Sequence, residues 1–110
     1  MKHYPIANVT LSGAGTNTYL LRVPQHNDFE YANLYATLDS EGLSISSCTW
    51  QLMEEDGTTA ISAATAFDSR GAAAGYSNGV AAAPQIKITI TVTGAGEAGT
   101  LKVDGPLARV

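Results

Sequence analysis

Three spaced glycines near the C-terminus form the most specific chemical motif in the chain. Residues 94–99, Gly-Ala-Gly-Glu-Ala-Gly, match the pattern that holds the pyrophosphate of a dinucleotide after a strand. That binding requires a helix to begin at the glycines, because the helix N-terminus meets the phosphates. Here a strand-like segment and Pro106 follow the glycines instead. We therefore interpret residues 94–99 as a turn between strands and expect no cofactor.

The other side chains that could do chemistry lack the partners that such chemistry needs. The acidic run at 54–57, Glu-Glu-Asp-Gly, does not have the alternating oxygen ligands of a calcium loop. His3 and His26 have no His or Cys at the short spacing usual for metal sites. Cys48 alternates with Trp50 in an apolar segment, which is typical of a buried thiol and not of a nucleophile. We expect no catalytic residue and no metal site, and we interpret the protein as a structural or binding part and not as an enzyme.

The chain carries few charges, and this excludes several classes of partner. Its formal net charge is -4, and its six basic residues are scattered along the sequence. Nucleic-acid binding needs a basic stripe, which is absent, and no apolar run is long enough for a membrane span. Only 15% of the residues are charged, against roughly 25% in a typical soluble domain. Two interpretations stay open: a surface covered by neighbours in an assembly, or an ordinary β protein rich in Thr and Ala.

The strands that position these residues are predicted from the alternation of apolar and polar residues, which has a period of two. Residues 86–93, Ile-Lys-Ile-Thr-Ile-Thr-Val-Thr, place branched apolar side chains on one face and Lys or Thr on the other. The alternation resumes at 100–104 after the glycines, so we predict a hairpin. Residues 9–11 and 18–23 repeat the plan of strand, Gly-Ala-Gly turn and strand.

A long strand is predicted from Leu43 to about Met53. Its apolar residues change parity at Ser46 and Ser47, which indicates a β-bulge that keeps both groups on one side. We expect Trp50 in the core. After the turn at residues 54–57, the segment at residues 58–62 is predicted to return as a paired strand.

Tyrosines on the outer face of a predicted strand are the best candidates for contact with a partner. From Tyr31 to Leu38 aliphatic residues alternate with aromatic or polar ones, so the aliphatic face should point inward. Tyr31 and Tyr35 would then point outward, where aromatic rings can anchor a protein partner or a sugar. Cover by a second sheet or by a nearby loop is the alternative. The candidate interface residues are Tyr31, Tyr35, Tyr4, Ile6 and Tyr76.

These elements predict a single all-β domain over residues 1–110, with little or no helix. Short strands between Gly-rich turns indicate an antiparallel sandwich or barrel, of jelly-roll or immunoglobulin-like type. Residues 69–83, rich in Ala, Gly and Ser, are predicted to form a flexible loop around short strands at Tyr76 and Val80, and one helical turn in the Ala runs is the alternative. Residues 1–6 lead straight into a strand, so we expect no signal peptide, and they could form an arm that pairs with a neighbour's sheet.

The stretch from Cys48 to Val103 resembles small virion proteins of phages. It has a Thr-Trp-Gln-Leu strand, an acidic Asp-Gly turn, an Ala/Gly/Ser-rich middle, the alternating strand from Gln85 to Thr93, a Gly-rich turn and a last short strand. The resemblance implies a β-sandwich of the kind that decorates phage heads or occurs in head fibres and in tail or baseplate adhesins. It brings no catalytic residues with it.

Three functional hypotheses follow. The first is a head decoration (cement) protein that binds the major capsid protein or another virion protein as a homo-oligomer, a trimer being one arrangement; it would assemble in the host cytoplasm and reside in the virion. The second is a carbohydrate-binding or adhesin module in which Tyr31, Tyr35 or Tyr76 stacks on sugar. The third is a small hydrolase that gathers His26 with acidic residues from distant loops.

Overall fold

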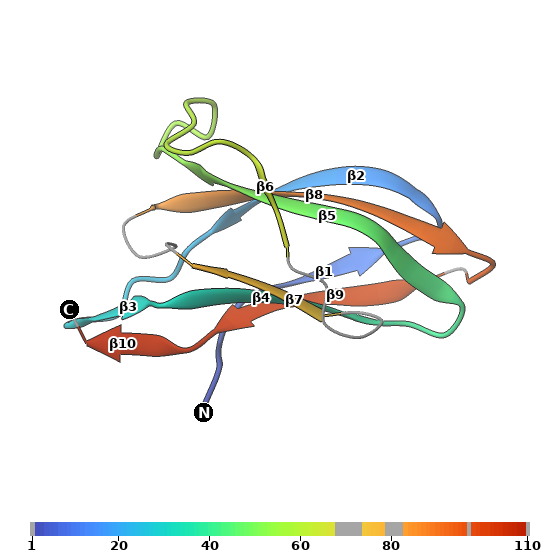
Figure 1. Ribbon diagram of the computed structural model, residues 1–110, viewed down its shortest axis with the longest axis horizontal. Coiled ribbons are helices and arrows are strands. Elements are labelled where there is room, and N and C mark those ends of the chain that lie inside the picture. Colours follow the sequence, from blue (N-terminus) through green and yellow to red (C-terminus); the bar gives the residue numbers. More distant parts are fainter. Residues whose placement is uncertain (1, 68–73, 79–82, 97, 110) are drawn as a thin grey trace.

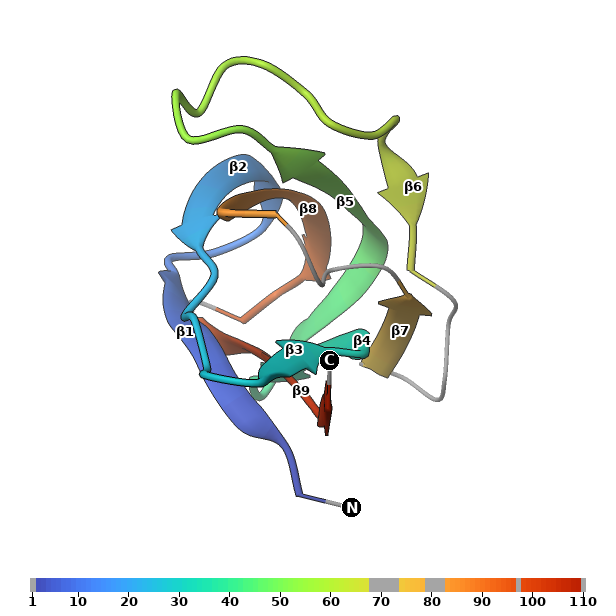
Figure 2. The ribbon, with the colours of Figure 1, turned by 90° about the vertical axis from the view of Figure 1, so that its left-hand side faces the viewer.

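Two four-stranded antiparallel sheets face each other, with a two-stranded ribbon at one end (Figures 1 and 2). The computed structural model describes residues 2–67, 74–78, 83–96 and 98–109, and within these ranges it contains strands and no helix. This confirms the predicted all-β sandwich. The strands are β1 (Tyr4–Leu11), β2 (Gly15–Arg22), β3 (Phe29–Tyr31), β4 (Asn33–Asp39), β5 (Leu43–Met53), β6 (Thr65–Ala66), β7 (Ala74–Asn78), β8 (Gln85–Gly94), β9 (Gly99–Gly105) and β10 (Leu107–Arg109).

The strand order defines a jelly roll. The first sheet has the order β1-β9-β4-β7 and the second has the order β2-β8-β5-β6, while β10 pairs with β3. The chain therefore changes sheet between β1 and β2, between β2 and β4 by way of β3, between β4 and β5, and at each step from β6 to β7, β8 and β9. Eight strands in two such interleaved sheets form the double Greek key of a jelly roll, and the alternative immunoglobulin-like order does not occur.

The predicted hairpin between residues 86–93 and 100–104 is wrong. β8 pairs with β2 and β5, whereas β9 pairs with β1 and β4 in the opposite sheet. The glycine-rich link between them crosses the sandwich, and so does the link between β1 and β2. Alternation specifies which side of a strand is buried but not which strand lies next to it, so both links look like hairpin turns in the sequence.

The core lies between the inner faces of the two sheets. Ile86, Ile88 and Ile90 on β8 are 0% exposed, and so are Leu101 and Val103 on β9. Each strand thus places the apolar half of its alternation inside, as the sequence predicts. The predicted core positions at Cys48 and Trp50 are also confirmed, because both side chains are buried.

The predicted bulge in β5 is confirmed at its expected place. The register of β5 against β8 shifts between Ile45 and Ser47. Leu43 before the shift and Cys48 after it are both buried, although they stand on opposite parities of the sequence. The extra residue therefore returns the second half of the strand to the core-facing side.

Two segments at the sheet margins differ from their predictions. Residues 58–62 do not form a continuous strand: they pair with β5 through an isolated bridge between Met53 and Ala60, and the edge strand of that sheet is β6. Residues 4–6 of the expected N-terminal arm belong to β1, where Tyr4 lies opposite Gly105 of β9 in the same chain, and the pairing of the arm with a neighbour stays a prediction.

The region predicted as a flexible loop, residues 69–83, contains β7 around Tyr76, which pairs with β4. Residues 68–73 and 79–82, including the predicted strand at Val80, lie outside the described residues, so the flexibility of the loop stays a prediction.

Two glycines at the ends of the links between the sheets can show how closely the backbones approach each other there. Gly94 (φ 121°) and Gly15 (φ 140°) both have backbones that L-residues avoid. A Cβ on Gly94 would collide with the carbonyl oxygen of Gly42, whereas one on Gly15 would meet open space. We expect Gly94→Ala to lower the free energy of unfolding by more than about 1 kcal/mol beyond the effect of Gly15→Ala, because only the first adds a clash to the strain. Urea denaturation of both variants measures this, and equal losses would contradict the close approach.

Candidate binding site

A group of aromatic and ionisable side chains gathers where the N-terminal segment contacts β3, β4 and β9. Figure 1 shows the course of these strands. The group comes from the start of β1, from the loop before β3, and from β3, β4 and β9. We call it the terminal cluster, and its members are His3, Tyr4, His26, Tyr31, Tyr35 and Asp104.

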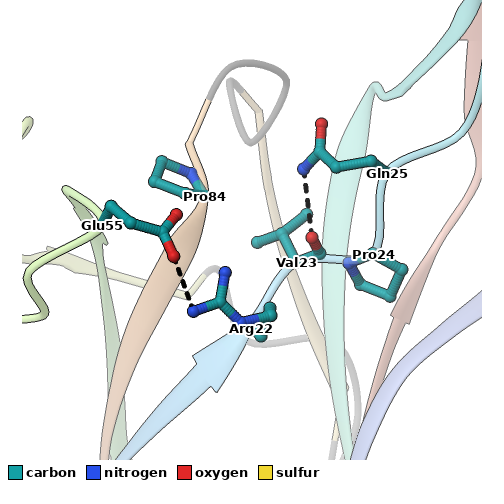
Figure 3. A pocket seen from close by; sticks show the side chains of 6 residues that line it. All are labelled: Arg22, Val23, Pro24, Gln25, Glu55 and Pro84. Atoms are coloured by element: carbon teal, nitrogen blue, oxygen red, sulfur yellow. Dashed lines mark hydrogen bonds and ion pairs between the residues drawn. The ribbon is translucent and has the colours of Figure 1, made fainter.

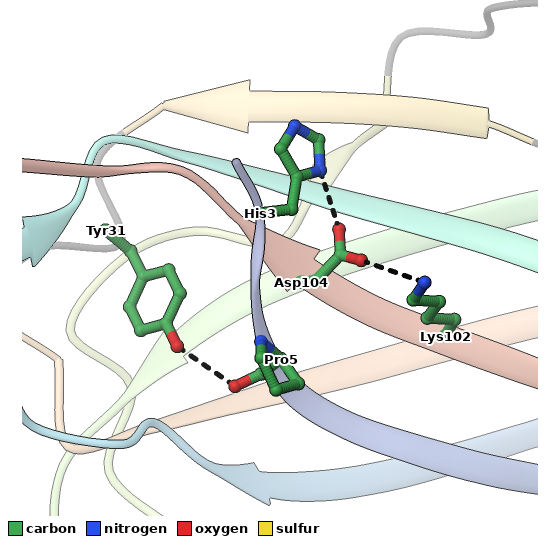
Figure 4. Close-up of polar contacts among 5 residues, drawn as sticks. All are labelled: His3, Pro5, Tyr31, Lys102 and Asp104. Atoms are coloured by element: carbon green, nitrogen blue, oxygen red, sulfur yellow. Dashed lines mark hydrogen bonds and ion pairs between the residues drawn. The ribbon is translucent and has the colours of Figure 1, made fainter. Parts of the chain in front are cut away.

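Tyr31 is the buried centre of the terminal cluster. Its side chain is 2% exposed, and its hydroxyl donates a hydrogen bond of 3.0 Å to the carbonyl oxygen of Pro5 (Figure 4). Nε2 of His26 lies 3.2 Å from the same hydroxyl oxygen. Because the hydroxyl has one proton and gives it to Pro5, His26 must donate from Nε2. The backbone of Tyr31 also pairs with Leu107 of β10, so this residue joins both terminal segments.

The surroundings of Tyr31 disfavour its ionised form. Burial, and then the negative charge of Asp104, raise the pKa of its hydroxyl above the ordinary value of about 10. The hydroxyl therefore stays protonated, and remains a donor to Pro5, throughout the neutral pH range.

Asp104 holds the other half of the terminal cluster together. It is 8% exposed, although it lies on the outer face of the first sheet. Nδ1 of His3 lies 3.0 Å from one of its carboxylate oxygens, and Nζ of Lys102 lies 3.8 Å from the other (Figure 4). The ring of His3 also packs against Tyr35, with centroids 4.5 Å apart. The covered carboxylate thus anchors the first residues of the chain to β9 and β4.

The structure places the predicted interface residues in or near the terminal cluster, but they differ in burial and in contacts. Tyr4 is partly buried: its ring lies edge-on to His26, 5.7 Å between centroids, and Nζ of Lys2 stands 5.1 Å from the ring centre. Ile6, at the bulge of β1, packs against the core. Tyr76 lies opposite Tyr35 in the register of β7 against β4.

The outward orientation predicted for Tyr31 is wrong. The alternation was extended through Ala32, but the chain leaves the strand there, and the Ala32 N–H donates to the carbonyl of Pro106. Tyr31 therefore belongs to β3 and its parity does not continue into β4. Tyr35 does lie on the outer face, opposite in parity to the buried Leu34 and Ala36.

Asp104 and the histidines are members of the terminal cluster that sequence reasoning missed. The sequence gives His3 and His26 no His or Cys partner at short spacing. Their partners, Asp104 and Tyr31, come from other strands, and strand pairing alone brings them together.

The acidic run at residues 54–57 serves the turn that it forms. The carboxylate of Asp56 accepts hydrogen bonds from the backbone N–H groups of Thr58 and Thr59 and from the Thr59 hydroxyl. These bonds, chiefly those of Thr59, lower the pKa of Asp56 to about 2. The buried Gln85 amide donates to the carbonyl oxygens of residues 54 and 55 and fixes the turn to β8.

A pocket of about 300 Å³ opens beside this turn (Figure 3). Arg22 and Glu55 face each other in it at 2.7 Å, and both side chains are largely exposed. Neither histidine lines it, so its lining does not provide the acid–histidine group that the hydrolase hypothesis requires. The lining residues are Arg22, Val23, Pro24, Gln25, Glu55 and Pro84.

The described residues provide neither a metal-binding cluster nor a membrane-spanning helix. They contain no group of three or more His, Cys, Asp or Glu side chains placed to hold a metal ion. No helix suited to crossing a membrane occurs in the same part of the chain.

The outer face of the second sheet is an extended surface of hydroxyl groups. The hydroxyl of Thr16 on β2 lies 2.8 Å from that of Thr91 on β8, and Thr18 lies 3.2 Å from Thr89 in the same way. Thr49 on β5 continues the row, opposite Thr89. We call these five residues the threonine face. None of them carries a charge, so a partner could cover them without desolvating an ion.

Comparisons with known proteins give distant structural matches. No protein-family model and no curated protein matches the sequence. Among the solved structures that match are those of infectious bursal disease virus, Gx strain (TM-score 0.45, 17% identity over 96% of this chain) and Gt strain (TM-score 0.45, 16% identity over 96%). This chain spans 30% of the length of either viral chain. A likeness this distant adds nothing to the fold and function argued from the chain itself.

The hydroxyl of Tyr31 can be removed to test its role in the terminal cluster. We expect Tyr31→Phe to lower the free energy of unfolding by about 1 kcal/mol, because the Pro5 carbonyl loses its donor. Tyr19→Phe is the matched control, since the described residues offer the Tyr19 hydroxyl no hydrogen-bond partner.

The same variant tests the pH dependence. A raised folded-state pKa means that the contribution of Tyr31 is full below about pH 10 and is lost as pH rises through the folded value. The stability of Tyr31→Phe should therefore fall less above pH 10 than that of the parent protein. Parallel decline of both proteins in urea melts at alkaline pH would contradict the assignment.

The thiol of Cys48 should be unreactive in the folded protein. Burial raises its pKa to about 12, so almost no thiolate exists at pH 8. We expect labelling with a disulfide reagent to proceed only at the rate of unfolding. Ser47→Cys places a thiol at the exposed neighbouring position and should react rapidly. Fast, stoichiometric labelling of the parent protein would contradict the burial of Cys48.

Proposed function

We propose that this domain is a phage virion protein that decorates the head and stabilises the capsid lattice. The observation that carries the proposal is the jelly-roll strand order joined to a patch of five uncharged threonines on the outer face of the second sheet. Jelly rolls occur in viral capsid and lectin domains, among others, so the fold alone does not decide the function. The threonine face adds a surface that suits burial against a protein partner.

The mechanism would be mass action. A protein that binds the assembled lattice and not its free subunits lowers the free energy of the assembled state. With so few charges available, the contacts would consist of apolar burial and hydrogen bonds, with the threonine face as the contact surface. The partner would be the major capsid protein or another virion protein, met in the host cytoplasm during assembly.

The two alternatives have less support in the structure. Of the tyrosines considered for sugar stacking, Tyr31 is buried and the ring of Tyr35 is contacted by His3. The histidine considered for hydrolysis, His26, is engaged with the Tyr31 hydroxyl.

Co-sedimentation with capsids assembled without this protein tests the proposal. We expect binding that changes little between low and high salt, because ion pairs would contribute little. Thr91→Glu should weaken it by at least about tenfold, since a carboxylate on the threonine face would be buried without a partner. Thr100→Glu, exposed on the outer face of the first sheet, is the matched control and should bind normally. Absence of binding at every salt concentration would refute the virion role, and equal losses in both variants would refute the threonine face as its surface.

A further inference from the structure

Within the part of the chain that the structure describes, each sheet has two outermost strands that pair with a neighbour on one side only. These strands are β1 and β7 in the first sheet and β2 and β6 in the second. An unpaired edge is a template for pairing with another chain, and proteins usually protect it with proline, bulges, charges or short strands.

Three of the four edges carry such protection. β1 contains Pro5 and a register shift between Pro5 and Ala7. β6 has only two residues, and the five described residues of β7 offer a shorter edge than the eight of β2. Each of these devices reduces the number of regularly spaced donors and acceptors that a second chain could meet.

β2 lacks these protections except for one charge, at its last residue Arg22. It is eight residues long, contains no proline, and keeps an unbroken register with β8 from Gly15 to Arg22. No charged residue precedes Arg22 in it. The hydroxyls of Thr16 and Thr18 bond sideways to β8, so these side chains lean toward the sheet and not over its edge. Leu20 is 45% exposed on the same strand. Figure 2 shows β2 at the margin of its sheet, with β8 on one side.

We propose that the β2 edge binds the same edge of a second copy of this chain. Two copies would pair antiparallel about a twofold axis at Thr18, so that two four-stranded sheets join into one continuous sheet. Such an isologous contact is closed, since each copy uses its free edge once. This inference rests on the sheet edges and not on the proposed virion role.

The distribution of charge favours a second copy as the occupant. With the axis at Thr18, Leu20 of one copy lies opposite Thr16 of the other, and Arg22 lies opposite Ala14. The two Arg22 residues are then eight positions apart along the paired strands, about 26 Å at 3.3 Å per residue. That distance exceeds the screening length of about 8 Å at physiological salt, so the only charged residues of the paired strands do not repel each other.

The first test is the mass of the purified protein in solution, without capsids, by sedimentation velocity over a range of concentrations. We expect a monomer–dimer equilibrium in the parent protein. Thr18→Lys should sediment as a monomer at concentrations where the parent is mostly dimeric, because two ammonium groups would meet at the axis. Thr10→Lys, the same change at an exposed position of the protected strand β1, should dimerise like the parent.

A monomeric parent at its highest soluble concentration would overturn the proposal, and so would Thr18→Lys dimerising as well as Thr10→Lys. Circular dichroism of both variants confirms that they are folded. Because no capsid is present, failure here leaves the virion proposal untouched, and failure of capsid binding leaves the dimer untouched.

Cross-linking locates the axis. Directly opposite residues of antiparallel strands have Cα atoms about 4.5–5.5 Å apart, which suits a disulfide. Thr18→Cys should therefore give a covalent dimer on mild oxidation, whereas Thr10→Cys should not. Cys48 does not interfere, because it is buried and its pKa is about 12. Absence of a covalent dimer in Thr18→Cys, or equal amounts in both variants, would overturn the pairing at Thr18.

Discussion

The burial of one face of β8 is the interaction on which the rest of the structure depends. β8 lies between β2 and β5, and its inward residues Ile86, Ile88 and Ile90 are fully removed from solvent. Burial of an isoleucine is worth about 1.5–3 kcal/mol, and the single cysteine permits no internal disulfide, so apolar contact of this kind must hold the sheets together. In the opposite sheet, Leu101 and Val103 of β9 belong to the same buried core. The crossing links are short because these faces must meet directly.

What the sequence predicts well is the orientation of side chains within a strand. The alternation of β8, the bulge at Ser46–Ser47 and the core position of Trp50 all follow from which side of the pleat is apolar, a property that neighbouring residues determine among themselves. Which strands become neighbours is a different matter. β8 and β9 look like a hairpin because nothing local distinguishes a turn within a sheet from a link between sheets. That distinction is made by the summed packing of all eight strands.

The terminal cluster shows the same division. Tyr35 could be placed on an outer face from its own strand, but Tyr31 could not, because the pairing with the C-terminal strands shifts by one residue between them. His3 and Asp104 are almost a full chain length apart and meet only because β1 pairs with β9. The jelly roll brings the two ends together, and the buried carboxylate and the Tyr31 hydroxyl then bind the N-terminal segment in place. The tyrosines noted in the sequence thus prove to be largely occupied with the protein itself.

The surfaces left over are the threonine face and the β2 edge, and they are adjacent. Thr16 and Thr18 belong to both, because they lie on the strand that forms the edge and point to the outer face. Pairing of two copies at β2 would therefore continue the threonine face from one copy to the next. When two linked copies bind a repeating lattice, the first contact holds the second copy close to its site, so the second contact forms at a high effective concentration. Weak contacts without ion pairs could therefore suffice for stable binding. With few charges, a single copy is only weakly repelled by its neighbours. In this arrangement the same low charge content allows both surfaces to be covered, because few ions must be desolvated.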